Sequence, residues 1–150
     1  MRMGTGMVLG TAGQSMLFTL VGSAGLIVAA FLDWIRPEGI RGIDVGYRAF
    51  YRTNFSVDAT FLRSAGAVSI MIGILAILGL ASRAGWITRL AGALGIIAFA
   101  LFTITLYRAD FDLPRALGPG MWVMLGGALV TMFGGFFATR PRVVVTNTTE

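Results

Sequence analysis

The sequence predicts an all-α fold: a bundle of four transmembrane helices, built from two antiparallel hairpins, with a long loop between helices 1 and 2. Of the 150 residues, 56% are hydrophobic and 13% are charged, whereas a soluble domain has about 25% charged residues. The apolar residues gather in four stretches, each near or above the roughly 18 residues that cross a bilayer. Aromatic residues stand near the ends of these stretches, as in the belts at membrane surfaces. They are Trp34, Trp86, Tyr107 and Trp122.

The first predicted helix covers residues 16–35, MLFTLVGSAGLIVAAFLDWI. Its apolar run is longer than the roughly 7–15 residues of a signal peptide, so we favour a retained helix over a cleaved leader. Residues 36–63 form the longest polar segment, where Pro37 and several glycines interrupt helix. The second helix is predicted over 64–82, where the sequence is apolar again.

A short basic turn at 83–89 leads to the third predicted helix at 90–107. The segment 106–122, LYRADFDLPRALGPGMW, carries two arginines and two aspartates before a Gly-Pro-Gly turn opens the fourth helix at 119–138. The tail at 141–150 is polar, and we expect it to be mobile. All 150 residues are therefore predicted to form a single membrane domain.

Two short segments of the chain resemble each other. Residues 47–55 read YRAFYRTNF and residues 107–111 read YRADF, and each follows an odd-numbered helix. The similarity suggests a parallel repeat, in which the two helical hairpins share one orientation.

The membrane orientation is predicted from the arginines. An even number of spans places both termini on one side, with five arginines there and seven on the other side. The bare count favours external termini. The 83–89 turn and the start of the tail, however, carry arginines without acidic neighbours, so we favour cytoplasmic termini in a multi-pass plasma-membrane protein.

The composition excludes many kinds of chemistry. The chain has no cysteine and no histidine, and all 12 basic residues are arginines. Disulfides, zinc sites with Cys or His ligands, imidazole bases and lysine Schiff bases are therefore excluded. The arginines stand singly along the chain, so nucleic-acid binding is not predicted. We expect no catalytic residues, no metal ligands and no cofactor.

The loop charges have two interpretations. Asp110 and Asp112, together with another loop acid, could bind a divalent cation or act as an acid–base pair. Because arginines are interleaved with the acids, we favour a charge clasp in which Arg108 or Arg115 pairs with an acid and the segment 106–122 lies against 36–63. The predicted clasp comprises Asp33, Arg36, Glu38, Arg41, Asp44, Arg48, Arg108, Asp110, Asp112 and Arg115.

The motif GYRAFYRTNF at 46–55 alternates aromatic residues with arginine. It could hold an anionic headgroup or a partner, but we favour an interfacial loop whose rings rest on the membrane. Small residues also recur at four-residue spacing, which predicts helix-packing faces. These residues are Ala65, Ser69, Gly73, Ala91, Gly95, Gly127, Thr131 and Gly135. We favour packing within the bundle over binding to another subunit or self-association.

The composition and two segments of the sequence also resemble those of a known group of membrane proteins. The segments DWIRPEGI and LGPGMWVMLGGALV, and the arginine-only, Ala/Gly/Leu-rich composition, are similar to small four-helix membrane proteins of actinobacterial type. Most such proteins have no assigned function, so the resemblance implies a plasma-membrane location. The layout is also similar to claudins, without their loop cysteines. We expect an accessory or structural subunit of a membrane complex, with a small transport component as the alternative. No proline or charge interrupts the middle of a span, which counts against ion-coupled transport.

Overall fold

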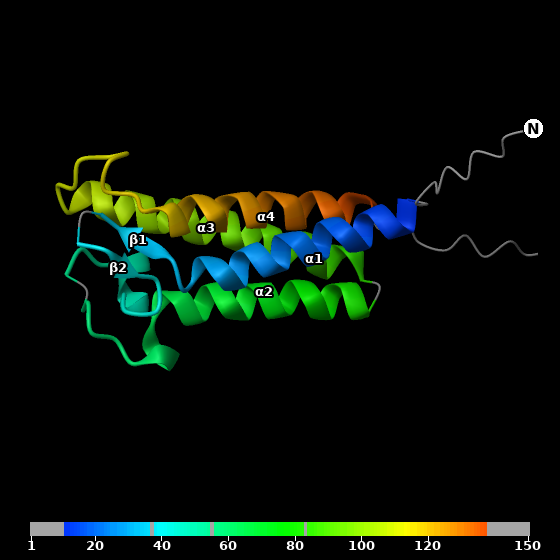
Figure 1. Ribbon diagram of the computed structural model, residues 1–150, viewed down its shortest axis with the longest axis horizontal. Coiled ribbons are helices and arrows are strands. Elements are labelled where there is room, and N and C mark those ends of the chain that lie inside the picture. Colours follow the sequence, from blue (N-terminus) through cyan, green and yellow to red (C-terminus); the bar gives the residue numbers. More distant parts are fainter. Residues whose placement is uncertain (1–10, 37, 55, 83, 138–150) are drawn as a thin grey trace, which may run out of the picture.

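The computed structural model describes residues 11–36, 38–54, 56–82 and 84–137, so the predicted mobile tail at 141–150 lies outside the described residues. The described chain is all-helical apart from a small hairpin. Its four α-helices lie side by side along the long axis of the molecule (Figure 1). Their bounds are α1 Thr11–Ala29, α2 Ala65–Ala81, α3 Gly85–Arg108 and α4 Pro119–Phe137.

Successive helices run in opposite directions and form two antiparallel hairpins, α1–α2 and α3–α4, as predicted. Each helix packs on its neighbours in the sequence, and α1 packs closely on α4, which closes the bundle. Both hairpins have the same orientation, but their connecting loops differ in length and in secondary structure. The internal repeat therefore stays a prediction.

Three predicted helix boundaries are wrong. Helix α1 already includes Thr11, five residues before the predicted start at residue 16. Helix α1 ends at Ala29, because the chain then turns and Asp33–Ile35 forms strand β1, paired antiparallel with β2, Ile40–Arg41. The prediction extended to residue 35 because this segment is apolar. Its residues Ala30, Trp34 and Ile35 are buried, but they lie in the loop after the helix. Helix α3 begins at Gly85, so much of the predicted basic turn is the first turn of that helix.

The bundle has small residues inside and large residues outside. All eight residues predicted to form helix-packing faces are buried between helices. Methionine, leucine, isoleucine and phenylalanine side chains are prominent among the exposed residues of all four helices. Only two helices, α3 and α4, are long and apolar enough to cross a membrane, while the described part of α1 and helix α2 are shorter apolar helices.

Close packing is most evident between α1 and α4. A Cβ atom added at Gly127 would lie 2.8 Å from the Gly22 carbonyl oxygen, so the two backbones are in contact there. The Ser15 hydroxyl donates a 2.7 Å hydrogen bond to the Gly134 carbonyl across the same interface. The Ser69 hydroxyl of α2 donates one of 2.6 Å to the Leu26 carbonyl of α1. Small residues therefore allow the helices to approach and their hydroxyls to bond between helices.

The residues between α1 and α2, together with those between α3 and α4, form a folded layer that we call the cap (residues 30–64 and 109–118). It covers one end of the bundle, opposite the end where α1 begins and α4 ends (Figure 1). Besides the β1–β2 hairpin it contains two short 3-10 helices, η1 Tyr47–Phe50 and η2 Phe61–Arg63. The cap holds all candidate site residues except those of the packing faces and Arg108, which is the last residue of α3.

Candidate functional site

The residues of the predicted charge clasp are exposed, except Asp33, which is half-buried. In the described part of the chain only one ion pair joins two side chains, that of Arg115 and Asp112, with 3.5 Å between nitrogen and oxygen. These two residues belong to the same loop and are three positions apart. The structure therefore differs from the predicted clasp, because no ion pair among the described residues links the two loops.

The two loops are instead joined through their backbones. The Arg36 amide donates a 2.9 Å hydrogen bond to the Ala116 carbonyl, and the Gly118 amide donates one of 2.8 Å to the Trp34 carbonyl. A Cβ atom at residue 118 would collide with the Asp33 carbonyl, so only glycine allows this approach. The segment 106–122 thus lies against the start of the first loop, and backbone pairing holds it there.

The prediction that Trp34 lies in an interfacial belt is wrong, because this side chain is fully buried. Its indole N–H donates a 2.7 Å hydrogen bond to the Ala29 carbonyl at the end of α1, which also accepts a longer bond of 3.3 Å from the Leu32 amide. Its ring meets Phe102 edge-to-face at 5.2 Å between centroids, and Phe50 at 6.5 Å. Trp34 therefore fills the junction between the cap and the bundle, where it contacts Phe50 of the cap and Phe102 of α3. Trp86 and Trp122 are exposed.

Asp110 ends helix α3. Its backbone is left-handed, with φ of 60°, and its amide bonds to the Tyr107 carbonyl while the Phe111 amide bonds to the Leu106 carbonyl. This pair of bonds is the Schellman pattern that terminates helices. Asp112 pairs with Arg115. Among the described residues no group of three or more acids gathers in a way that could hold a metal ion.

The cap contains an arginine-lined cavity of about 790 Å³. Three arginines line it: Arg48 from η1, Arg52 just after η1, and Arg63 from η2. Asp58 is its one lining acid, so the lining side chains carry a formal charge of +2. The other lining residues are Gly46, Tyr47, Asn54, Ser56, Ala59 and Thr60. We call this site the arginine cavity.

Backbone pairing shapes the arginine cavity. Gly46 bridges to Ser64, and its amide donates a 2.9 Å hydrogen bond to the Ser56 carbonyl. The Ser64 hydroxyl accepts a bond from the Ala67 amide as the N-cap of α2 and donates one to the Phe61 carbonyl. These bonds attach both 3-10 helices to the start of α2, which positions arginines that lie far apart in the sequence.

A second cavity of about 290 Å³ adjoins the same loop. It shares Arg52 and Asn54 with the arginine cavity and adds Arg108 from the end of α3. No acid is among its lining residues, which also include Tyr51, Thr53 and Thr105. Arg108 therefore faces the first loop, as the clasp prediction required, but it meets arginine and neutral polar groups there.

The positive field of the arginine cavity acts on Tyr47. Interaction with the Arg48 side chain, then with the Tyr51 hydroxyl, lowers the pKa of the Tyr47 phenol, and the charge of Arg63 adds to the effect. Cations favour the phenolate over the neutral phenol. The alternation of aromatic residues and arginines at 46–55 was the sequence signal for this site, but it gave no indication that Arg63 would join it.

No family model, curated protein or solved structure matches the chain.

Proposed function

We propose that the chain is an integral plasma-membrane protein that crosses the bilayer four times and serves as an accessory or structural subunit of a membrane complex. The observation that carries the proposal is the inverted composition of the bundle. Its interior is rich in glycine, alanine, serine and threonine, while large apolar side chains point outward. A water-soluble bundle has the opposite arrangement, with a polar outer face.

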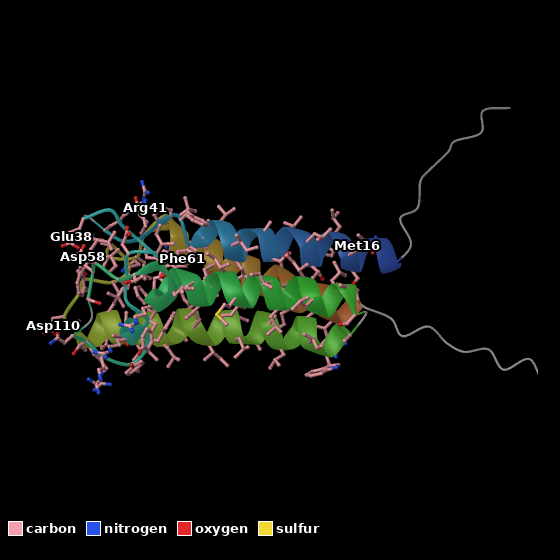
Figure 2. All side chains as sticks on the ribbon, turned by 90° about the horizontal axis from the view of Figure 1, so that it is seen from below. Met16, Glu38, Arg41, Asp58, Phe61 and Asp110 are labelled. Carbon is pink, nitrogen blue, oxygen red and sulfur yellow. The ribbon has the colours of Figure 1, made fainter. Side chains whose placement is uncertain are left out.

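The outward apolar surface extends over all four helices. Examples are Val21 on α1, Met71 on α2, Ile97 on α3 and Phe133 on α4, each at least half exposed. Helices α1, α2 and α4 contain no charged residue in their described length, and the only charges of α3 are arginines near its two ends. In Figure 2 the side chains along the helices are mainly carbon, and nitrogen and oxygen gather mainly at the cap. Such a surface favours hydrocarbon as its surroundings.

The lengths of α1 and α2 are compatible with spanning. The apolar stretches Gly13–Ala29 and Ala65–Ala81 contain 17 residues each, which corresponds to about 26 Å of helix. Helices of about 17–25 residues cross bilayers. The close packing of α1 on α4 further supports a location at the same membrane depth as α4.

Single-cysteine labelling tests the number of spans, because the chain has no cysteine of its own. In native membranes we expect Met71→Cys and Ile97→Cys to resist a water-soluble maleimide, and Glu38→Cys in the cap to react. Labelling of Met71→Cys as fast as Glu38→Cys would refute a spanning α2. With intact cells, external labelling of Glu38→Cys supports cytoplasmic termini, and internal labelling alone contradicts them.

The accessory role is supported by the closed bundle. The helices touch through backbone atoms, and the two cavities described above lie at the cap end. This arrangement favours a scaffold over the alternative, a small transport component with a solute path through a single chain. Purification of the tagged full chain from its native membrane in mild detergent should recover another membrane protein in stoichiometric amounts. Recovery of the chain alone, as a monomer or homo-oligomer, would contradict the accessory role.

A further inference from the structure

We propose that the arginine cavity binds a phosphate group, presented by the headgroup of an anionic phospholipid. The phosphate chemistry follows from the cavity itself, whereas the lipid source rests on the membrane location proposed above. The site goes beyond that proposal, because a four-span bundle needs no headgroup site in its cap.

The first argument is charge. Arg48, Arg52 and Arg63 converge on one cavity, and none of them forms an ion pair with a described carboxylate. Three guanidinium groups around one space repel one another, and a bound anion would relieve the part of that repulsion which solvent does not screen around these exposed side chains. Guanidinium groups bind phosphate through two parallel hydrogen bonds, and they are weakly hydrated, so arginine suits this ligand better than lysine.

The second argument is the supply of neutral donors. The hydroxyls of Ser56 and Thr60 and the amide of Asn54 line the same cavity as the arginines. These groups can donate to phosphate oxygens that the arginines leave free. Asp58 also lines the cavity and opposes an anion, but it offsets only one of the three positive charges. A net charge of +2 remains to match a phosphate of charge −1 or −2.

The third argument concerns the source of the phosphate. Next to Arg63 in η2, the apolar side chain of Leu62 is 84% exposed and that of Phe61 is 48% exposed. Figure 1 shows this segment extending beyond the flank of α2, and Figure 2 places Phe61 beside the start of α2, while Glu38 and Asp110 lie at the outer end of the cap. If the helices cross the bilayer, Phe61 and Leu62 lie at headgroup depth. Their side chains can then enter the acyl region, while the arginines of the cavity stay on the side of the headgroups.

The fourth argument concerns Tyr47 and the neighbouring cavity. Interaction with Arg48, together with the charge of Arg63, lowers the pKa of the Tyr47 phenol, as expected beside a cluster of the same arginines. The cavity also continues into the second one through Arg52, which adds the charge of Arg108. A headgroup with more than one phosphate or anionic oxygen would therefore find further cationic partners.

Isothermal titration of the detergent-purified full chain tests the site with three probes: dihexanoyl phosphatidic acid, dihexanoyl phosphatidylcholine and inorganic phosphate. We expect phosphatidic acid to bind more tightly than the other two. Arg48→Gln/Arg63→Gln should weaken its binding roughly tenfold or more, since two charge-assisted contacts are lost. Arg36→Gln/Arg115→Gln removes the same charge from cap arginines outside the cavity and should leave binding within about twofold of wild type.

Each other outcome overturns a defined part of the proposal. Unchanged affinity in Arg48→Gln/Arg63→Gln, in a variant with wild-type circular dichroism, refutes the site. Inorganic phosphate binding as tightly as phosphatidic acid refutes the lipid source, and so does a Leu62→Ser variant with unchanged lipid affinity. Failure of the cysteine-labelling test with binding intact would remove the membrane location and leave the phosphate site standing.

Discussion

Gly126 and Gly127 are adjacent residues of α4 with opposite surroundings, and they allow a matched test of backbone contact in the bundle. A Cβ atom added at Gly126 meets nothing within 4 Å. One added at Gly127 would lie 2.8 Å from the Gly22 carbonyl oxygen and 3.0 Å from the Leu26 amide nitrogen, both on α1. We therefore compare Gly126→Ala with Gly127→Ala.

The expected magnitude follows from these distances. Ordinary contact begins at 3.4 Å, so α1 and α4 would have to separate by about 0.6 Å, and forced repacking of this kind costs about 1–3 kcal/mol. Alanine is also favoured over glycine in a helix by up to about 1 kcal/mol. That gain is common to both variants and cancels in their difference. Gly127→Ala should therefore be about 1–3 kcal/mol less stable than Gly126→Ala.

Unfolding in mixed micelles of dodecyl sulfate and a mild detergent, followed by far-UV circular dichroism, measures this difference. Gly126→Ala serves as the control, since it adds the same methyl group to the same helix turn. A difference below about 0.5 kcal/mol, the size typical of surface substitutions, would refute the backbone contact between α1 and α4.

Three further predictions concern the cap. Trp34→Phe removes the shorter of the two hydrogen bonds to the Ala29 carbonyl and leaves space in a fully buried site, so it should lower the free energy of unfolding by about 1–3 kcal/mol, while Trp86→Phe at an exposed site should change it little. Asp110→Gly removes a left-handed non-glycine residue and should raise unfolding free energy by about 1 kcal/mol or less; a clear loss would mean that the aspartate side chain stabilises the turn. Absorbance titration at about 295 nm should show one tyrosine ionising below its usual pKa of about 10, and Arg48→Gln should raise the pKa of Tyr47. Because the folded-state pKa is lowered, this tyrosine begins to add stability as the pH rises through that lowered pKa and adds it in full above the unfolded pKa, so unfolding measured at pH 7 should not register it.

The bundle was largely predictable because its signals are local. Apolar length predicted the four helices, and four-residue spacing of small residues predicted which faces would be buried, since both depend only on helix geometry. Gly127 and Thr131 could be assigned to the buried face of α4 without knowing which residues they contact. The end of α1 was less predictable, because the residues after Ala29 are as apolar as those before it.

The cap was poorly predictable because its contacts join distant segments. Trp34 resembles an interfacial tryptophan in sequence, yet Gly42 and Gly120 approach its ring so closely that any side chain at either position would collide with it. Neither of these close contacts could be predicted from the residues next to Trp34 in the sequence. The arginine cavity likewise depends on the bridge from Gly46 to Ser64, which brings Arg63 to Arg48. Charge spacing alone suggested ion pairs across the loops, where the structure has backbone pairing.

The bundle and the cap bury opposite kinds of residue. This contrast supports the proposed membrane boundary and does not depend on the hydropathy of sequence windows. In the bundle, small residues are inside and large apolar residues outside. In the cap, Trp34, Ile35 and Val45 are buried and most charged residues are exposed, as in a soluble domain. In the proposed membrane location, each layer would expose the side chains that its surroundings solvate best. The reversal falls between the end of α1 and the start of α2, which is also where η2 carries its exposed leucine beside Arg63. A phosphate site at that level would lie where a bilayer supplies phosphate.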